Sequence, residues 1–250
     1  MIVRLYRNTD LFGVRDLFIE RSLMFDEELF AWKKRAPLTF SWVGEHEGRI
    51  VAHYSIIVQP LLPGYVCGFA VDAIVSSTHG QVRYIKQLID TALEQAGHEG
   101  IQIVVGFANE KMAPVKRFLG WKQVGSYSWQ TSDGLVIANE PIGLNHGLDT
   151  YEQWRYLGCP REYSACYEAG KLMGGFSSVG DAAPMLVKHD SEQWNLLVNE
   201  YRFRYLKRFE AEIKEGGIIE PLYYPLISVN DIQWPVVWPL ETVEGVTLGW

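Results

Sequence analysis

One polar turn between two apolar segments carries the residue types that could bind an anion. The strand-like residues 71–75 lead through two serines, a threonine and a histidine into Gly80, Gln81, Val82 and Arg83. Backbone N–H groups at a helix N-terminus favour phosphate, and a small residue lets the backbone approach it closely. The sequence therefore predicts a strand, a phosphate-sized turn and a helix that begins near Gln81.

A carboxylate interrupts the apolar strand just before that turn. Asp72 lies within the otherwise apolar residues 71–75. A buried charge is costly unless it has a partner or a use. Asp72 is therefore a candidate general base, and the alternative is a structural carboxylate that ties its strand to a loop. The further candidates on or beside the preceding hairpin are Glu45, His46 and His53.

The elements that must position these groups follow from hydrophobic periodicity. After Gln81, apolar residues recur at steps of three and four until Gly97, and this segment predicts the clearest helix of the chain. Residues 101–108 form a continuous apolar run, typical of a strand covered on both faces. A short helix is expected over residues 113–119. The elements expected before the turn are an edge strand over 2–6, helices over 11–24 and 26–34, and strands over 40–45, 50–59 and 66–75.

This order of elements and two motifs resemble the GNAT superfamily of acyl-coenzyme A-dependent N-acyltransferases. Many members with a Trp-Lys/Arg-Tyr element before the first hairpin read approximately Asp-Thr-x-x-x-Pro-x-Tyr-Arg-Gly-Lys-Gly-Ile-Phe, and residues 72–85 follow that spacing. Residues 80–83 read Gly-Gln-Val-Arg where the family has Arg-Gly-Lys-Gly. The second motif is the short helix that ends in Gly120 and Trp121. The resemblance implies an α/β fold with a GNAT-like mixed sheet and flanking helices.

The resemblance also implies a binding site for acetyl-coenzyme A. In the family, amides of the turn contact the pyrophosphate, strand amides polarise the thioester carbonyl, and an Asn after the next strand contacts the cofactor or orders the strands. Arg83 has two interpretations, since its guanidinium could pair with a phosphate or its bulk could block the pocket. For Asn109 the alternative is a helix cap. The residues expected to bind the cofactor are Ile74, Val75, Gly80, Gln81, Val82, Arg83, Tyr84 and Asn109.

The resemblance further implies an acid that protonates the leaving thiolate. Family members often carry a Tyr five residues before the closing aromatic, and this chain has Lys116 there. An exposed lysine titrates near about 10.4, so the favoured alternative for Lys116 is a surface or phosphate-side position. Tyr84 and Tyr127 are further candidate acids. Asp72 is the first choice for the base that deprotonates the acceptor amine.

The activity implied is direct transfer of an acyl group, with acetyl expected, from coenzyme A to an amine of a small molecule. An amino sugar is among the candidate acceptors, and the reaction needs no metal. Two alternatives stay open. The lost glycines and the missing Tyr favour a catalytically silent GNAT-like binding module, and an altered pocket would suit a different or longer acyl donor.

The second half of the chain carries the trace of a repeat. Residues 32–55 align without a gap on residues 154–177, and Gly48 matches Gly170. We therefore expect a GNAT-like domain over 1–135 and a related α+β half over 136–250, possessing a strand over 185–189 and a long helix over 192–213. Residues 188–192 contain no glycine, so this half is interpreted as a scaffold. The tail, rich in Pro and aromatic residues, is expected to be an extended segment packed on the body.

Composition narrows the class of protein. The 250 residues carry a formal charge of −7 without a long Lys/Arg run, which argues against nucleic acid as the main partner and suits a cationic amine. Three cysteines without a CxxC motif predict reduced thiols rather than a disulfide frame or a metal site. The charged N-terminus and the short apolar runs predict neither a secretion signal nor a membrane span. We expect a cytoplasmic protein, and its oligomeric state stays open.

Overall fold

The computed structural model divides the chain into two compact units. The residues that it describes are 1–59, 62, 64–79, 82–107, 112–125, 127–131, 149–160, 163–168, 171–177, 183–187, 203–208, 218–219, 221–228, 232, 234 and 237–238. The first unit comprises Met1–Gly125, Glu220–Trp234 and Gly245–Trp250, and the second comprises Ser126–Ile219 and Pro235–Glu244. This division differs from the two consecutive stretches 1–135 and 136–250 expected from the sequence, because the second unit begins at Ser126 and the residues Glu220–Trp234 and Gly245–Trp250 return to the first unit.

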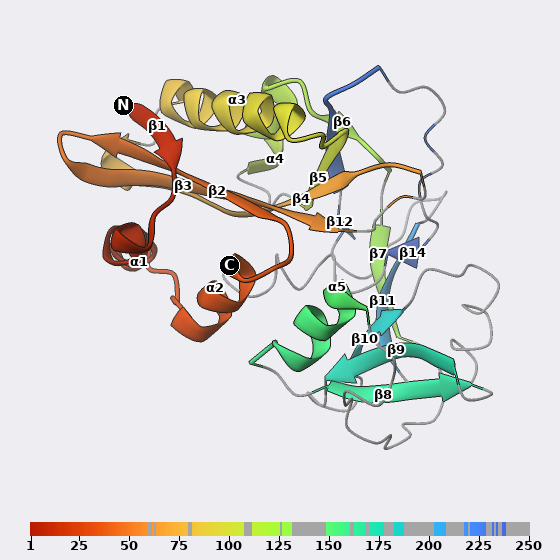
Figure 1. Cartoon of the computed structure of the whole chain (residues 1–250). Coiled ribbons are helices and arrows are strands. Elements are labelled where there is room, and N and C mark those ends of the chain that lie inside the picture. The colour runs from red at the N-terminus through yellow and green to blue at the C-terminus, as the bar shows by residue number, and fades with distance from the viewer. Residues whose placement is uncertain are drawn as a thin grey trace. The chain divides into compact units, whose positions relative to one another are not determined.

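The first unit is built on a seven-stranded mixed sheet in the order β1-β2-β3-β4-β5-β13-β6 (Figure 1). All neighbours are antiparallel except β4 and β5, which are parallel. The strands are β1 Ile2–Leu5, β2 Thr39–His46, β3 Arg49–Gln59, β4 Cys67–Val75, β5 Ile103–Phe107, β6 Lys122–Gln123 and β13 Pro221–Pro225.

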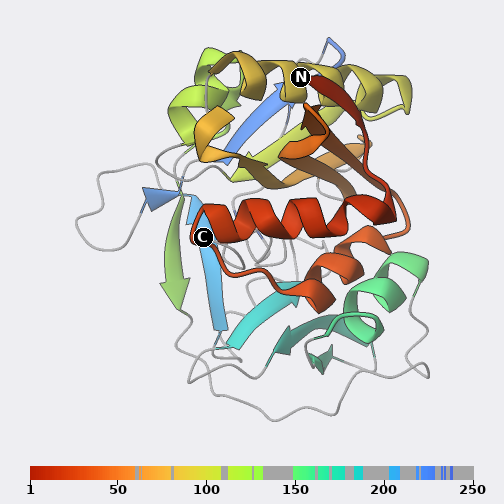
Figure 2. The ribbon, with the colours of Figure 1, turned by 90° about the vertical axis from the view of Figure 1, so that its left-hand side faces the viewer.

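Helices cover both faces of this sheet. Figures 1 and 2 show α3 and α4 on one face and α1 and α2 on the other. The helices are α1 Leu11–Glu20, α2 Glu27–Lys34, α3 Val82–His98 and α4 Met112–Phe118, with 3-10 turns η1 Asn8–Asp10 and η2 Ser77–His79. The core between α3 and the sheet includes Leu88, Ile89 and Leu93, whose helical spacing predicted this face.

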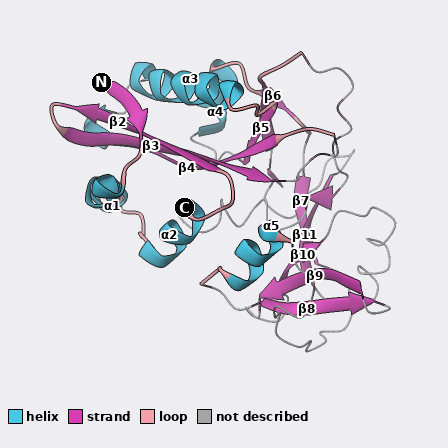
Figure 3. Cartoon of the chain, viewed as in Figure 1, coloured by secondary structure: helices cyan, strands magenta, loops and turns pink. Residues whose placement is uncertain are grey.

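The predicted segment around the turn is confirmed. Strand β4, the turn η2 and helix α3 follow one another, and the described part of α3 runs from Val82 to His98, directly after Gln81, where the helix was expected to begin and which lies outside the described residues. Strands β4 and β5 lie side by side in one sheet. The predicted α/β class is therefore confirmed (Figure 3).

The second unit contains a sheet in the order β12-β7-β11-β10-β9-β8, with β14 also paired to β11. The elements are β7 Tyr127–Thr131, α5 Thr150–Glu152, the π-helical turn Gln153–Leu157, β8 Tyr163–Glu168, β9 Lys171–Ser177, β10 Ala183–Val187, β11 Phe203–Arg208, β12 Ile218–Ile219 and β14 Val237–Trp238. The long helix expected over 192–213 is wrong for residues 203–208. They form β11 because β7 and β10 pair with its two edges, and such tertiary pairing overrides a helical spacing of apolar residues.

The two sheets repeat one pairing pattern. In β2-β3-β4-β5-β13-β6 only the β4–β5 pair is parallel, and in β8-β9-β10-β11-β7-β12 only the β10–β11 pair is parallel. The equal strand order predicted around the hairpins at Gly48 and Gly170 is therefore confirmed. A helical segment that carries a buried tryptophan, Trp32 or Trp154, precedes each hairpin.

Two strands lie in a different sheet from their neighbours in the sequence. β7 follows β6 in the sequence but joins the second sheet, whereas β13 comes from the C-terminal part and lies between β5 and β6 of the first sheet. The tail segment at residues 221–225 is thus a paired strand and more than an extended segment packed on the body. The first sheet therefore contains a strand from the C-terminal part of the chain, and the second sheet contains the strand that directly follows β6.

Of the described helices, none combines the length and apolar character that a bilayer crossing requires. The described residues also contain no group of three or more His, Cys, Asp or Glu side chains placed to hold a metal ion.

Candidate functional site

The two parallel strands of the first sheet part in the middle of β4. Their pairing runs from Cys67 and Ile103 to Phe69 and Val105 and stops there, although β4 continues to Val75. Beyond Phe69, β4 is paired in this register only with β3. Backbone N–H groups on the β5 side of β4 are thereby available for a ligand between the strands.

A bulge lies in β4 just after the strands part. His53 pairs with Ile74 and Ser55 pairs with Val71, so Asp72 and Ala73 together oppose one residue of β3. Asp72 has φ of 53°. This left-handed conformation costs a non-glycine residue about 1–2 kcal/mol, and bulges re-aim side chains next to functional sites. The bulge turns Asp72 toward helix α2.

The side chains of this part of β4 are divided between the two faces of the sheet. Ala70, Ala73 and Val75 pack with the core under α3, whereas Ile74 packs with the core that includes α1. Asp72 contacts Lys33 of α2 on the α1 and α2 face. Side chains on both faces of the sheet therefore lie next to the position where β4 and β5 separate.

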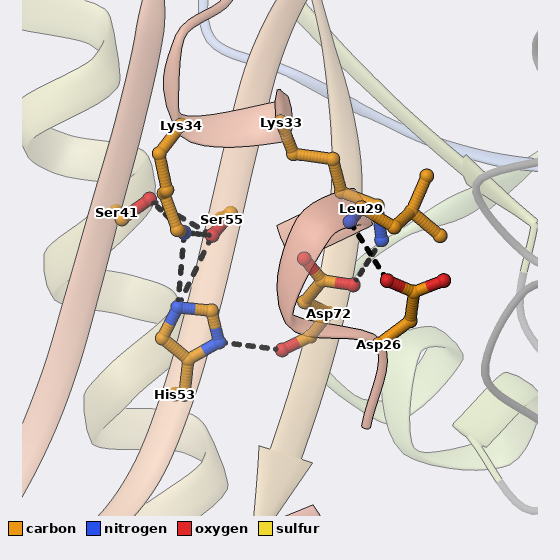
Figure 4. A network of polar contacts seen from close by, with 8 residues as sticks. All are labelled: Asp26, Leu29, Lys33, Lys34, Ser41, His53, Ser55 and Asp72. Carbon is orange, nitrogen blue, oxygen red and sulfur yellow. Dashed lines mark hydrogen bonds and ion pairs between the residues drawn. The ribbon is translucent and has the colours of Figure 1, made fainter. Parts of the chain in front are cut away.

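Asp72 is a buried carboxylate with one oxygen paired and one free. Lys33 Nζ lies 2.6 Å from Oδ1, while Oδ2 is buried without a hydrogen-bond partner among the described residues (Figure 4). Burial acts to raise the pKa of Asp72, but the charges of Lys33 and Lys34 outweigh it, so the pKa lies below its ordinary value. Asp72 is therefore ionised at neutral pH. A buried anionic oxygen without a donor is suited to an N–H group of a ligand.

Lys116 lies on the opposite face and is buried. It is 4% exposed, its Nζ lies 4.2 Å from the centre of the Trp121 ring, and a Cβ atom at Gly106 would overlap with it. The expected surface position is therefore wrong, because Gly106 on β5 leaves room for the lysine head group. Burial lowers the pKa of Lys116 to about 7. A group with this pKa can both hold and release a proton near neutral pH.

The turn before α3 is partly described. Arg83 is exposed, and its guanidinium donates to the Tyr84 hydroxyl at 2.9 Å and lies 4.6 Å from that ring. Val82 is also exposed. Both side chains thus lie at the surface, near the N-terminus of α3. Gly80, Gln81 and Asn109, three of the expected cofactor residues, lie outside the described residues.

Glu20 of α1 holds the beginning of this turn, which sequence analysis missed. Its Oε1 accepts hydrogen bonds from the N–H and the hydroxyl of Ser77, both at 2.5 Å, and from the Ser76 hydroxyl at 2.9 Å. These bonds, those of Ser77 first, lower the pKa of Glu20. The turn is separated from α1 by more than fifty residues, so no local pattern could have indicated this contact.

A pocket of about 680 Å³ opens beside α1 and the β2–β3 hairpin. Arg4 lines this pocket and forms ion pairs of 2.7 Å with Asp10 and 2.9 Å with Glu45, which also line it. Glu45, a candidate base in the sequence, lines this pocket, whereas Asp72 and Lys116 do not. His46 instead lies in an aromatic cluster with His79 and Tyr84, with ring centres 5.2–6.1 Å apart.

Solved structures identify the fold. The chain is similar to a putative acetyltransferase from Pyrococcus horikoshii, with 9% identity and a TM-score of 0.62 over 94% of this chain and 91% of that chain. It is also similar to a conserved protein of unknown function from Enterococcus faecalis V583, named as a probable N-acyltransferase, with 10% identity and a TM-score of 0.60 over 90% of this chain and 72% of that chain. No protein-family model matches the sequence, and no curated protein matches it. The chain has the fold of the GNAT acyl-coenzyme A N-acyltransferases.

Proposed function

We propose that the protein transfers an acyl group, with acetyl expected, from coenzyme A to an amine of a small molecule. One observation carries this proposal. The strands β4 and β5 part at Phe69 and Val105, and this place has a free anionic oxygen of Asp72 on one face and Lys116 on the other. An amine and a leaving thiolate need such groups on opposite sides of a thioester.

The coenzyme would bind between β4 and α3. The N–H group of Val75, which lies on the β5 side of β4 next to Ile74, would polarise the thioester carbonyl. The turn from Gly80 to Tyr84 would meet the pyrophosphate at the N-terminus of α3. Arg83 supports this placement, since its exposed guanidinium at the first turn of α3 can pair with a phosphate. Asn109 would contact the coenzyme or order the end of β5.

Asp72 would orient the acceptor. Its free Oδ2 would accept a hydrogen bond from the amine and hold the nitrogen near the carbonyl carbon. A pKa below the ordinary value makes Asp72 a weak base toward a free amine. The nitrogen becomes far more acidic once its bond to the carbonyl carbon forms, and Asp72 then receives the proton.

Lys116 would act as the acid. As the tetrahedral intermediate collapses, the C–S bond breaks, its electron pair goes to sulfur, and the Lys116 ammonium gives that sulfur a proton. A pKa of about 7 is close to the operating pH, where proton transfer is most efficient. Lys116 would thus replace the tyrosine that many GNAT members use.

The acceptor class follows from charge. The free carboxylate oxygen and the net charge of −7 favour an amine that arrives as a cation, gives one proton to solvent and attacks as the neutral amine. An amino sugar is one such molecule. The acyl donor would be met in the cytoplasm, where we place the protein.

The experiment is a titration of the full chain with coenzyme A by calorimetry, followed by a thiol-release assay with acetyl-coenzyme A and a panel of amines. We expect micromolar binding and amine-dependent release. Lys116→Met should lower kcat by about 100-fold, within the range for a lost general acid, with little change in KM for the acyl donor. The exposed Lys122→Met on β6 is the matched control and should leave kcat unchanged. Absence of coenzyme binding at millimolar concentration would instead favour the silent module.

A further inference from the structure

A second polar cluster lies under α2, and none of its side chains is among those proposed to contact the reactants. It consists of Lys34 at the end of α2, Ser41 on β2, and His53 and Ser55 on β3 (Figure 4). His53 is 0% exposed and both serines are buried. Burying so many polar groups costs free energy unless each has a hydrogen-bond partner. The partners of these groups therefore indicate which parts of the structure the cluster fixes.

The ammonium group of Lys34 finds one acceptor for each of its three N–H bonds. Its Nζ lies 2.5 Å from Ser41 Oγ, 2.6 Å from Ser55 Oγ and 3.1 Å from His53 Nε2. The centres of the Phe30 and Tyr6 rings lie 4.5 Å and 5.1 Å from it. An ammonium has three donors and no acceptor. The charged form of Lys34 is therefore fully matched by its surroundings.

This match fixes the tautomer of His53. Because Lys34 can only donate, Nε2 of the imidazole must accept, and the ring proton must sit on Nδ1. Nδ1 lies 3.0 Å from the backbone oxygen of Asp72 and donates to it. Burial, followed by the charge of Lys34, lowers the pKa of His53 to about 3, so the ring is neutral at neutral pH.

The carbonyl that His53 holds belongs to the bulge. Asp72 has no partner in the register between β3 and β4, and its φ of 53° turns its carbonyl away from a regular ladder. The imidazole N–H supplies the donor that the ladder does not. Strained backbone conformations persist only where the surroundings impose them.

We propose that His53 and Lys34 are positioning residues that fix the β4 bulge and thereby aim the Asp72 carboxylate at the acceptor amine and the Val75 amide at the acyl carbonyl. The inference rests on the proposed acyl transfer. Lys34 locks the imidazole in one tautomer, the imidazole locks the carbonyl of Asp72, and that carbonyl sets the direction of the strand beyond it. Neither residue touches the reacting atoms.

The device depends on the proton of Lys34. Burial lowers the pKa of Lys34 to about 7, with Asp72 acting against this shift and Lys33 adding to it. The other titratable groups that face Lys34 are His53 from β3 and the Tyr6 phenol. When Lys34 loses its proton, the neutral amine has a lone pair that can accept from Nε2. The ring proton of His53 can then move from Nδ1 to Nε2, which leaves the lone pair of Nδ1 facing the oxygen of the Asp72 carbonyl without a proton between them. Alkaline pH should therefore loosen the bulge.

The test uses the full chain and four variants, of which Lys34→Met removes the ammonium group. His53→Ala removes the donor, His53→Asn retains an amide N–H for the Asp72 carbonyl, and Tyr54→Phe is the control. Tyr54 is the next residue of β3, faces the α3 core, and its buried hydroxyl has no partner among the described residues. Two measurements need no substrate, namely amide hydrogen exchange at Ile74 and Val75 and the ¹⁵N shifts of the His53 ring. The third measurement is kcat and KM for acetyl-coenzyme A.

We expect the Nδ1–H tautomer in the parent at pH 6, where Lys34 is charged, and faster exchange at Ile74 and Val75 in His53→Ala. Lys34→Met removes a charge that lowers the pKa of His53, so the imidazole should gain a proton at a higher pH than in the parent. The kcat of His53→Ala should fall about 10-fold to 100-fold, the scale of a small misplacement of reacting groups, while KM stays within about 3-fold. His53→Asn should recover most of the loss, and Tyr54→Phe should match the parent.

The outcomes separate the two proposals. An Nε2–H tautomer in the parent, or exchange and kcat in His53→Ala equal to those of Tyr54→Phe, would overturn the positioning role and leave acyl transfer standing. A parent that neither binds nor uses acetyl-coenzyme A would defeat acyl transfer. The ring shifts and the exchange rates would then still decide whether His53 holds the bulge.

Discussion

Lys33 Nζ lies 2.6 Å from Asp72 Oδ1, and both side chains are 8% exposed. This ion pair joins the last turn of α2 to the bulge of β4, 39 positions later in the sequence. A buried pair adds little to stability when compared with apolar residues of the same shape, but breaking it leaves one charge buried alone. Asp72 therefore stays ionised only when α2 is packed so that Lys33 lies beside it.

Removing one partner of this pair should be costly. We expect Lys33→Met and Asp72→Asn each to lower the free energy of unfolding by about 3–5 kcal/mol, and the double variant to lose less than the sum of the two. Urea unfolding measures all three. The exposed pair of Lys86 and Asp90 on α3 is the control, where Lys86→Met should cost less than about 0.5 kcal/mol. Additive losses at Lys33 and Asp72 would mean that the two charges do not interact.

Sequence could predict what is encoded locally. The spacing of Leu88, Ile89 and Leu93 specified the buried face of α3, and the apolar residues before Phe107 specified a central strand. These signals arise within one element and need no knowledge of its neighbours.

The remaining features depend on contacts between distant segments. Asp72 was recognised as a costly carboxylate, but nothing near it in sequence indicates Lys33 or His53. Lys116 read as an exposed lysine because its burial depends on Gly106 in another element. Residues 203–208 read as a helix because their apolar spacing fits one, whereas the edges of β7 and β10 make them a strand.

The buried Lys116 should impose a pH dependence on stability. Its pKa is about 7 in the folded protein and 10.5 as the ordinary value, so between these values the unfolded chain binds more protons. The free energy of unfolding therefore rises with pH in this window, by up to about 1.4 kcal/mol per pH unit. Below pH 7 Lys116 is charged in both states, so the folded protein carries the full cost of burying that charge. Lys116→Met should be more stable than the parent at pH 6, and the difference should shrink by pH 9.

Urea unfolding at pH 6, 7, 8 and 9 measures this difference. Lys34, whose pKa burial lowers to about 7, and Cys67, whose pKa burial raises to about 11, are present in both parent and variant, so their contributions cancel in this difference. A difference between parent and Lys116→Met that is constant with pH would show that Lys116 keeps its ordinary pKa in the folded protein.

The affinity for coenzyme A should depend on Arg83. If its exposed guanidinium pairs with a phosphate, Arg83→Ala should weaken binding by about 1.5–3 kcal/mol, the range for hydrogen bonds to charged groups. Calorimetry at two salt concentrations measures the change, and the loss should be smaller at high salt because exposed charges are screened. Exposed Arg117→Ala on α4 is a control of equal charge. Tighter binding by Arg83→Ala would indicate an obstructing side chain.

The first sheet should depend on a residue from the far end of the chain. Leu222 on β13 is 0% exposed and packs in the core with Leu88 and Trp121, between strands β5 and β6. Leu222→Ala removes buried methyl groups and leaves a cavity, so it should cost about 2–5 kcal/mol. The loss should appear in the unfolding of the first unit, as shown by faster amide exchange at Val104 and Val105, which pair with Tyr224 and Tyr223. Ile227→Ala, an exposed position shortly after β13, should cost little. Unchanged exchange at β5 in Leu222→Ala would mean that β13 is not an integral strand of the first sheet.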